Sequence, residues 1–426
     1  MDSTPTRIVI LGAGYVGLPL AIAFARQNNL VTNLDIDQEK VDALRRGSSS
    51  VTGVDSEELK TLIRDGKYTA TSKAECIKIA NVVIVCVPTP LSKSREPDLR
   101  PLRQALEAVA QFAQRGQLII LESTTYPGTT QELVVPRLEK AGFHPGEDLY
   151  VAFSPERIDT GNREYQLHNT PKIVAGINEI SLQKALEVYE LVVEKLVPVS
   201  SPTTAELAKL LENTFRAVNI GLANEVAVMA SHLGVDPFEV IDAAATKPFG
   251  FMPFSPGPGI GGHCLPVDPL YLSWRMNHFA YEAKFISLAD QVNQGMPDYV
   301  VNRVADGLNR SRLSLNGSRT LLCGVTYKPE VNDIRESPAL EVMRLLESKG
   351  AHVDYLDPLV PHLPTRHGGK ESIQLDSDFH SYDAVIVTTP HQQLPYDRLA
   401  KESRLLLDTR GAFRHRNISA PNIWSL

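Results

Sequence analysis

One cysteine of this sequence lies in a glycine-rich stretch, GPGIGGHCLPVDP, at residues 257–269. Glycines on both sides of such a position let another molecule approach the backbone. A thiolate is a nucleophile that can add to a carbonyl carbon. The stretch therefore favours a functional thiol at Cys264 with Asp268 close by, although an isolated cysteine is usually buried and inert. A Cys–His pair with His263 is disfavoured, because adjacent side chains generally point apart.

Lys209 and Asn213 are the second pair of chemically capable residues, in the segment AELAKLLENTF. Their i,i+4 spacing places both side chains on one face of a helix. Apolar neighbours surround Lys209, so its charge can project into a site rather than into water. The alternative is a surface lysine paired with Glu206 or Glu212, and the spacing leaves both interpretations open.

A glycine turn near the start, LGAGYVGLPLAIAF, carries Gly12, Gly14 and Gly17 between a strand-like and a helix-like segment. In that context GxGxxG binds a pyrophosphate at the N-terminus of the helix. The next strand-like run, LVTNLDID, ends in Asp35, 18 residues after Gly17, near the spacing of a carboxylate that binds the adenosine ribose. An aspartate there would repel a 2′-phosphate, so the pattern predicts NAD rather than NADP. Lys40 could contact the adenosine end or be a solvated helix lysine.

The elements that must position these residues follow from the apolar patterning. Up to about residue 199, the strand-like runs RIVILGAG, LVTNLDID, NVVIVCVPTP, GQLIILEST and EDLYVAFSPE occur, with helical patterns between several of them. Nearly continuous apolar strands in such alternation predict a parallel sheet covered on both faces.

From about residue 200 the period becomes helical. One pattern ends at Gly234, a suitable C-cap, and another runs from about Ala280 to Leu308. The strand-like runs then return with SRTLLCGVTYK, HVDYLDPLV, YDAVIVTTP and RLLLDTRG. The sequence therefore predicts an α/β domain over 1–199, a helical region over 200–310 and a second α/β domain over 311–426.

Composition excludes several classes of protein. The 426 residues are 43% hydrophobic and 22% charged with a net charge of −7, so no basic excess exists to bind nucleic acid or an anionic membrane. No apolar run approaches the about 20 residues that span a bilayer. The first strand begins too early for a signal peptide. Four scattered cysteines without a CxxC pair lead us to expect no metal site, no disulfide and a reduced, cytoplasmic protein.

Several segments, in order, resemble the UDP-glucose/GDP-mannose dehydrogenase family of nucleotide-sugar 6-dehydrogenases. They are GAGYVGLPLA, VPTP, ESTTYPGTT, SPERIDTGN, AELAKLLENTFRAVNI, PGPGIGGHCLPVDP and TYKPEVNDIRESPA. Their joint order is far more specific than one glycine pattern and covers nearly the whole chain. The resemblance implies an NAD-binding Rossmann domain, a central helical dimerisation domain and a C-terminal Rossmann-like domain that binds a UDP-sugar. It also implies a homodimer or a higher homo-oligomer.

The resemblance further implies roles for the matching residues. The catalytic set would be Cys264 as nucleophile, Lys209 and Asn213 as oxyanion and substrate ligands, Asp268 as acid–base or water-positioning group, Thr125 as holder of the hydrolytic water, and Glu156 as acid–base group. The cofactor contacts would be Gly12, Gly14, Tyr15, Val16, Gly17, Asp35, Lys40, Pro88, Thr89, Thr125 and Arg335. The substrate contacts would be Glu156, Arg157, Lys209, Asn213, Gly259, Gly261, Tyr327, Lys328 and Arg410, with Lys247 able to reach the substrate of a second subunit.

The implied reaction oxidises the C6 alcohol of the sugar by four electrons. Hydride transfer to NAD gives an aldehyde, Cys264 adds to it, a second hydride transfer gives a thioester, and water releases the carboxylate. Two further interpretations compete with this one. A two-electron β-hydroxyacid dehydrogenase would share the first domain and a helix-borne lysine but give Cys264 no role, and a non-enzymatic NAD-binding protein would leave the whole set unexplained.

The loop around the cysteine departs from part of the family. UDP-glucose members read roughly GGxCFxKD, whereas this chain reads GGHCLPVDP and looks more like the UDP-N-acetylhexosamine members. KPFGFMPFSPGPG and ESTTYPGTT resemble the UDP-N-acetylglucosamine branch. We therefore expect UDP-N-acetylglucosaminuronic acid as the product, a precursor for surface polysaccharide. UDP-N-acetylmannosamine and UDP-glucose are the alternative substrates, because these residues do not define the stereochemistry at C2.

Overall fold

The computed structural model describes residues 5–49, 51, 53–92, 94–158, 162, 164–364 and 369–426. Residues 159–161 of the SPERIDTGN segment therefore lie outside the described residues. The chain forms two compact units, Met1–Glu212 with Leu270–Tyr281, and Asn213–Pro269 with Glu282–Leu426. The three-domain boundaries expected from the sequence stay a prediction.

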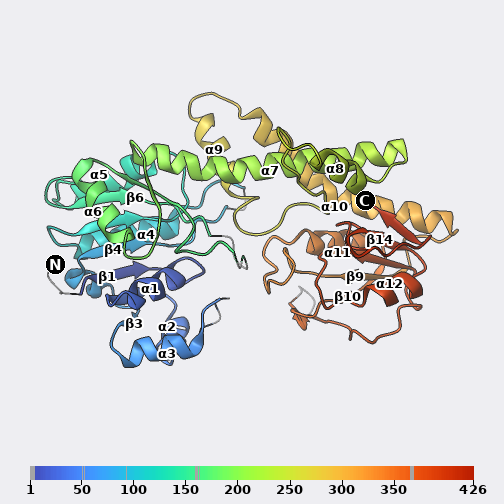
Figure 1. Ribbon diagram of the computed structural model, residues 1–426, viewed down its shortest axis with the longest axis horizontal. Coiled ribbons are helices and arrows are strands. Elements are labelled where there is room, and N and C mark those ends of the chain that lie inside the picture. The colour runs from blue at the N-terminus through green and yellow to red at the C-terminus, as the bar shows by residue number, and fades with distance from the viewer. Residues whose placement is uncertain are drawn as a thin grey trace. The chain divides into compact units, whose positions relative to one another are not determined.

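The first unit contains an eight-stranded sheet in the order β3-β2-β1-β4-β5-β6-β7-β8 (Figure 1). Its central strands are short apolar runs, such as RIVIL and VVIV, whose side chains are buried on both faces of the sheet. The strands are β1 (Arg7–Leu11), β2 (Leu30–Leu34), β3 (Tyr68–Thr71), β4 (Val82–Val85), β5 (Leu118–Leu121), β6 (Tyr150–Phe153), β7 (Lys172–Gly176) and β8 (Leu196–Pro198).

Helices cover both faces of this sheet. Successive side chains of a strand point to opposite sides, so each apolar strand contributes to a core on both faces. Ile8 and Ile10 belong to one apolar core and Val9 and Leu11 to the other. The helical elements are α1 (Gly17–Arg26), α2 (Gln38–Arg45), α3 (Ser56–Arg64), η1 (Ala74–Ile79), α4 (Arg100–Phe112), η2 (Thr130–Val134), α5 (Val135–Glu139) and α6 (Glu179–Tyr189).

One pair of strands is not parallel, a difference from the expected sheet. β7 runs antiparallel to β6, with Ala152 opposite Gly176. A parallel neighbour requires a crossover, usually a helix, and the described residues between β6 and β7 contain no helix. β7 therefore returns directly beside β6, and α6 then connects it to the parallel strand β8.

The central part of the chain is helical, as predicted. Helix α7 runs from Pro202 to Leu233 and ends at Gly234, whose φ of +69° suits a glycine C-cap. The others are α8 (Pro237–Ala245), α9 (Asp268–Asn277) and α10 (Lys284–Arg310). No helix in the described part of the chain is long and apolar enough to cross a membrane.

The second unit carries a five-stranded parallel sheet in the order β10-β9-β13-β14-β15 (Figure 1). Apolar cores lie on both of its faces. Its elements are β9 (Arg319–Cys323), α11 (Pro338–Ser348), β10 (His352–Leu356), β13 (Ala384–Val387), α12 (Tyr396–Glu402), β14 (Leu406–Asp408), η3 (Arg414–Arg416) and β15 (Ile423–Ser425), with a small hairpin of β11 (His362–Leu363) and β12 (Lys370–Glu371). Two Rossmann-like α/β domains with a central helical region confirm the predicted fold class.

Candidate active site

The glycine turn between β1 and α1 is fixed by its own backbone. Gly12 has a φ of +96°, and a Cβ there would lie 2.4 Å from the carbonyl oxygen of Cys86. A Cβ on Gly17 would lie 2.0 Å from the carbonyl oxygen of Gly12. A Cβ on Gly14, in contrast, would have nothing within 4 Å. The turn thus leaves open space beside Gly14, next to the start of α1, where a pyrophosphate could approach.

Asp35 is tied to this turn. Its Oδ2 accepts a hydrogen bond from the backbone N–H of Ala13 at 2.9 Å, and the Lys40 ammonium lies 3.0 Å from the same oxygen. Asp37, two residues on, instead caps α2 by accepting from the N–H of Lys40. Tyr15 and Val16, at the same turn, are half-buried. The structure therefore holds the predicted ribose-binding carboxylate at the glycine turn and pairs Lys40 with it.

Five further predicted residues lie at the same edge of the sheet. Pro88 and Thr89 follow β4, Thr125 follows β5, and Glu156 and Arg157 follow β6. The strand order reverses between β1 and β4. Ligands of doubly wound sheets bind outside the carboxyl ends of the strands at such a reversal. The residues that the sequence assigned to cofactor and catalysis in the first unit thus share one edge.

Two polar atoms at this edge are buried without a hydrogen-bond partner among the described residues. They are Oγ1 of Thr125 and Oε2 of Glu156. Glu156 is fixed by its other oxygen, which accepts from the N–H groups of Arg157 at 2.7 Å and Ile158 at 2.6 Å. Buried polar atoms without partners are rare. Both atoms belong to the predicted catalytic set, which supports a polar ligand or a water at this edge.

Glu206 of helix α7 binds residues 128–130, which follow Thr125 in the same loop. The Glu206 carboxylate is 1% exposed and accepts hydrogen bonds from the N–H of Gly128 at 2.6 Å. It also accepts from the N–H and the hydroxyl of Thr130, at 2.9 and 2.7 Å. Glu206 therefore positions residues 128–130 and is not available to neutralise a lysine.

Lys209 has neither of the partners that the alternative interpretation required. Glu212 forms its ion pair with Arg157, at 2.7 Å, and Glu206 is engaged as described. Within the described residues Lys209 forms no ion pair, and its side chain is half-buried. Glu206 and Glu212, the carboxylates near Lys209 on α7, are therefore both bound to other groups.

The second unit contains the cysteine with two of its predicted partners. Asn213 donates from Nδ2 to Oδ2 of Asp268 at 2.5 Å, and both residues are buried. The N–H of Asp268 donates to the carbonyl of Cys264 at 2.8 Å, where α9 begins. Cys264 is half-buried and His263 is exposed. Asp268 thus contacts both the Asn213 amide and the backbone of Cys264, and the roles expected of these residues stay predictions.

The glycines before Cys264 are packed rather than open. Gly259 and Gly262 have φ of +126° and +86°, a region that favours glycine. A Cβ on Gly261 would lie 2.7 Å from Cβ of Tyr327, and the N–H of Gly262 donates to the carbonyl of Arg335 at 3.1 Å. The protein itself thus fills the Cβ direction of Gly261, and the expected contact of this glycine with substrate stays a prediction.

Arg410 lies against the same glycine stretch. A Cβ on Gly257 would lie 2.3 Å from its Nη1, and its Nε donates to the carbonyl of Thr388 at 3.3 Å. Burial of the guanidinium lowers the pKa of Arg410 to about 10. No carboxylate in the described part of the chain forms an ion pair with it. A poorly solvated guanidinium of this kind favours an anionic ligand.

The other predicted substrate contacts and the predicted cofactor contact Arg335 lie in different settings. Tyr327 and Lys328 are half-buried just after β9, at the carboxyl edge of the second sheet. Arg335 binds the Asp333 carboxylate through Nε and Nη2, at 3.0 and 2.6 Å. Lys247 is exposed, with its ammonium 5.0 Å from the ring centroid of Phe249.

The second sheet repeats the geometry of the first glycine turn. Gly324 follows β9 with a φ of +86°, and the N–H of Val325 donates to Oδ2 of Asp357 at 2.7 Å, just after β10. Here, however, the imidazole of His391 also lies 3.2 Å from that oxygen, and Asp357 is 2% exposed. The carboxylate is thus bound within the protein.

Asp357 makes the stability of the second unit sensitive to acid. Burial opposes its ionisation, but His391 and the backbone N–H groups outweigh this and lower the pKa of Asp357. Its contribution is therefore complete above its unfolded pKa of about 3.9 and is lost as the pH falls through the lower folded value. We expect Asp357→Asn to flatten the loss of stability below about pH 4 in urea denaturation. Asp397→Asn, at an exposed position in α12, should leave that slope unchanged.

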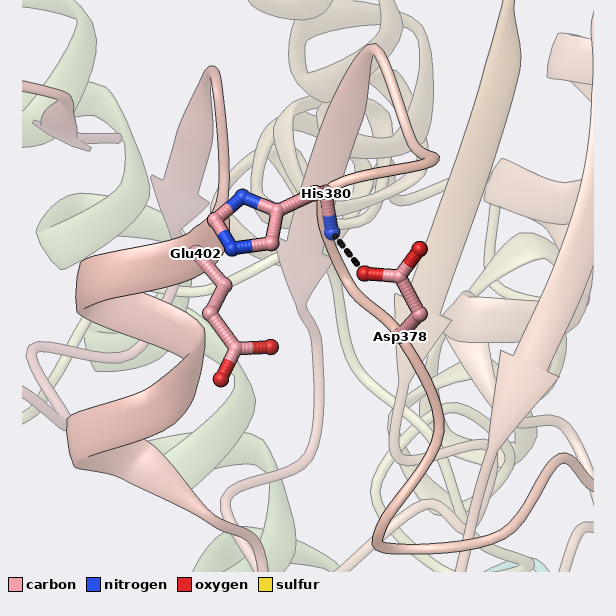
Figure 2. Close-up of side chains that lie close together, drawn as sticks. All are labelled: Asp378, His380 and Glu402. Carbon is pink, nitrogen blue, oxygen red and sulfur yellow. Dashed lines mark hydrogen bonds between the residues drawn. The ribbon is translucent and has the colours of Figure 1, made fainter.

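A cluster of possible metal ligands lies elsewhere in the second unit, formed by Asp378, His380 and Glu402 (Figure 2). Asp378 accepts the backbone N–H of His380, as the dashed line shows. Glu402 accepts two hydrogen bonds from the Arg398 guanidinium, at 2.8 and 2.9 Å. The arginine accounts for the charge of Glu402, and we assign no metal here.

Residues that position other residues through hydrogen bonds or ion pairs were not predicted from the sequence. Glu206 was considered only as a partner of Lys209. Asn224 was not singled out, although it accepts the N–H of Gly257 and donates to Asn293, both at 2.8 Å. Lys172 was also missed, and its signal was a charge in the otherwise apolar strand KIVAG.

Models of one protein family match most of the chain. The NAD binding domain of the UDP-glucose/GDP-mannose dehydrogenase family matches residues 6–193, its central domain residues 203–295, and its UDP binding domain residues 321–415. The chain belongs to this family. It is therefore an oxidoreductase of the nucleotide-sugar dehydrogenase type with an N-terminal NAD-binding domain and a C-terminal UDP-binding domain. The predicted family and cofactor are confirmed.

Relatives within the UDP-glucose/GDP-mannose dehydrogenase family cover nearly the full length. UDP-N-acetyl-D-glucosamine 6-dehydrogenase of Pseudomonas aeruginosa is 35% identical over 91% of each chain. NDP-N-acetyl-D-galactosaminuronic acid dehydrogenase of Ralstonia nicotianae is 33% identical over 97% of each. The solved structure of the UDP-N-acetyl-D-mannosamine dehydrogenase of Pyrococcus horikoshii shares 32% identity, covers 99% of each chain and superimposes with a TM-score of 0.89. These relatives act on different sugars, so the family alone does not define the substrate.

Proposed function

We propose that this dehydrogenase oxidises C6 of UDP-N-acetylglucosamine by four electrons to give UDP-N-acetylglucosaminuronic acid for surface polysaccharide. The observation that carries the proposal is the Cys264 loop, in which the carbonyl of Cys264 accepts the N–H of Asp268, and Asp268 is buried and hydrogen-bonded to Asn213. The GGHCLPVDP sequence and the Pseudomonas aeruginosa relative support the N-acetylglucosamine substrate. UDP-N-acetylmannosamine is the second candidate, supported by the Pyrococcus horikoshii relative. A cytoplasmic location stays a prediction.

In the proposed reaction NAD, when bound, accepts hydride from C6. The Cys264 thiolate adds to the aldehyde carbon, and the resulting thiohemiacetal would become a thioester by loss of a proton and of a hydride to a second NAD. Lys209 and Asn213 stabilise the oxyanion of that adduct, a role that suits a lysine without a paired carboxylate among the described residues. Asp268 accepts the hydrogen bond that orients the Asn213 amide.

The first unit supplies groups for proton transfer and hydrolysis. We assign to Thr125 the placing of the water that cleaves the thioester, and to Glu156 the exchange of protons with substrate. The support is that each presents a buried polar atom without a hydrogen-bond partner in the described ranges. In the second unit, Arg410, with Tyr327 and Lys328, would bind the UDP part, because the guanidinium suits a pyrophosphate.

The deciding experiment counts the NADH formed per sugar consumed, with NAD and a panel of UDP-sugars. Two NADH per UDP-N-acetylglucosamine, together with a faster reaction than for its C2 epimer, are expected. One NADH per sugar would instead support a two-electron dehydrogenase. The absence of turnover with every UDP-sugar would reject the proposed function.

Helix α7 exposes an apolar stripe that supports a homodimer. Leu211, Phe215 and Leu222 are 60%, 45% and 56% exposed and follow one face of the helix, with Leu207, Met229 and Leu233 in the same stripe. We propose that a second copy covers it. Leu222→Glu is expected to convert a dimer to a monomer in light scattering, whereas Glu225→Gln on the same helix should not. A monomeric wild-type protein would contradict the proposal.

Asp35 should determine how tightly the cofactor binds. Removal of a carboxylate that accepts ribose hydroxyls is expected to weaken NAD about 10- to 100-fold in Asp35→Ser. Titration calorimetry with NAD measures this effect. Asp37→Asn is the matched control, because this exposed residue caps α2 and an asparagine can cap equally well. Equal NAD affinities of wild type and Asp35→Ser would refute the assignment.

A further inference from the structure

Four residues of the first unit, Glu122, Lys172, Tyr189 and Cys86, form a largely buried polar cluster that the reaction described above does not use. The Cys86 thiol donates to Oε2 of Glu122 at 3.9 Å. The Lys172 ammonium at the start of β7 lies 3.1 Å from Oε1 of Glu122, and these side chains are 4% and 0% exposed. Tyr189 of α6 donates its hydroxyl to the same carboxylate oxygen. Burying two opposite charges costs several kcal/mol in lost hydration, and their attraction often repays this only in part. The cluster therefore calls for an explanation beyond stability.

The cluster reaches the candidate active site through Lys172. Its ammonium lies 3.8 Å from Oε2 of Glu156, the oxygen that is buried without a hydrogen-bond partner among the described residues. It also donates to the carbonyl of Pro155 at 3.3 Å, one residue before Glu156. Among the described residues, Lys172 is the cation that forms an ion pair with Glu156.

Two carboxylates thus share one cation. Glu122 and Glu156 outweigh the effect of burial and keep the pKa of Lys172 above its usual value, so the ammonium stays charged. Burial, with the charge of Glu156, raises the pKa of Glu122 although Lys172 and Tyr189 oppose it. On one side the ammonium contacts the Glu122 carboxylate, which also accepts the Tyr189 hydroxyl. On the other side it lies near Oε2 of Glu156.

We propose that Lys172 is a positioning residue that keeps the Glu156 carboxylate directed at the active-site edge. Glu122 and Tyr189 fix the ammonium in place for this purpose. The inference rests on the proposed acid–base role of Glu156.

The test is the pH profile of kcat for NADH formation. Glu156→Gln is expected to remove the acidic limb, which assigns that limb to Glu156. In Lys172→Met the limb should move to higher pH by about 1 unit or more, because the carboxyl group then protonates more easily. Lys172→Arg should restore the wild-type position. A structural role alone would lower activity at every pH without moving the limb.

Lys184→Met is the matched control. Its ammonium also lies over a tyrosine ring, 4.5 Å from the centroid of Tyr150, as that of Lys172 lies 4.9 Å from Tyr189. No carboxylate of the described residues forms an ion pair with Lys184, so its replacement should leave the limb in place.

A double variant keeps the test valid if Lys172→Met alone is unstable through its unpaired Glu122. Glu122→Gln/Lys172→Met removes both charges and keeps an acceptor for Tyr189. A limb that is still shifted in this variant supports the proposal, because Glu156 remains without its cation. A return to the wild-type profile would overturn it, since Lys172 would then matter only to Glu122. Wild-type activity in Glu156→Gln would also overturn it, while the NADH count would still test the dehydrogenase separately.

Discussion

Cys264→Ser is expected to slow the formation of the sugar carboxylate by on the order of 10³-fold or more. At neutral pH a serine hydroxyl is almost fully protonated, and it adds to an aldehyde far less readily than a thiolate does. The rate of NADH formation with saturating UDP-sugar measures the effect. Mass spectrometry of the wild-type protein after a rapid acid quench should detect a sugar adduct on the peptide that contains Cys264.

Cys76→Ser is the appropriate control. This thiol is half-buried in η1, where burial raises the pKa of Cys76 to about 11, so it is not a nucleophile at neutral pH. Its replacement should leave the rate of NADH formation within about twofold of wild type, because a conservative change remote from reacting groups has a small effect. An active Cys264→Ser protein that still forms two NADH per sugar would refute the thioester route.

Glu206→Ala is expected to have the largest effect on stability, lowering the free energy of unfolding of the first unit by about 3 kcal/mol. The change leaves the N–H groups of Gly128 and Thr130 and the Thr130 hydroxyl without their acceptor. Buried donors that lose their partner carry the full desolvation penalty. Urea denaturation followed by tryptophan fluorescence and circular dichroism measures the change.

Glu212→Ala provides the comparison on the same helix. Its ion pair with Arg157 joins side chains that are 34% and 28% exposed, and such pairs contribute about 0–1 kcal/mol. We therefore expect a change of at most about 1 kcal/mol in this variant. Equal destabilisation by the two substitutions would show that the hydrogen bonds of Glu206 are not what holds residues 128–130.

The apolar patterning was sufficient to predict most of the fold. The runs at Arg7–Leu11, Val82–Val85 and Leu118–Leu121 are buried on both faces, and only strands between two layers of helices require this pattern. The direction of β7 could not be predicted in this way. KIVAG is equally apolar in either orientation, and its antiparallel pairing depends on how residues 154–171 connect it to β6.

The candidate site was predictable where its chemistry lies in short segments. Asn213, Cys264 and Asp268 were proposed from local spacing and the family resemblance, and in the structure Asp268 contacts the Asn213 amide and the backbone of Cys264. Residues that support them were not found, because their partners are distant in sequence. Glu122 and Lys172 are 50 residues apart, and the charge of each looks like an ordinary surface charge until the sheet brings them together.

The turn after β9 has a consequence for the second domain. In each sheet, one strand is followed by a glycine and then by a backbone N–H that donates to an aspartate just after the neighbouring strand. This aspartate is Asp35 in the first sheet and Asp357 in the second. Each aspartate also has an internal side-chain donor, the Lys40 ammonium for Asp35 and the His391 imidazole for Asp357. The Lys40 side chain is 40% exposed and can turn away from a ribose, whereas that of His391 is 1% exposed and is held within the protein. The buried histidine thus distinguishes two similar turns, and we expect the second not to bind a ribose.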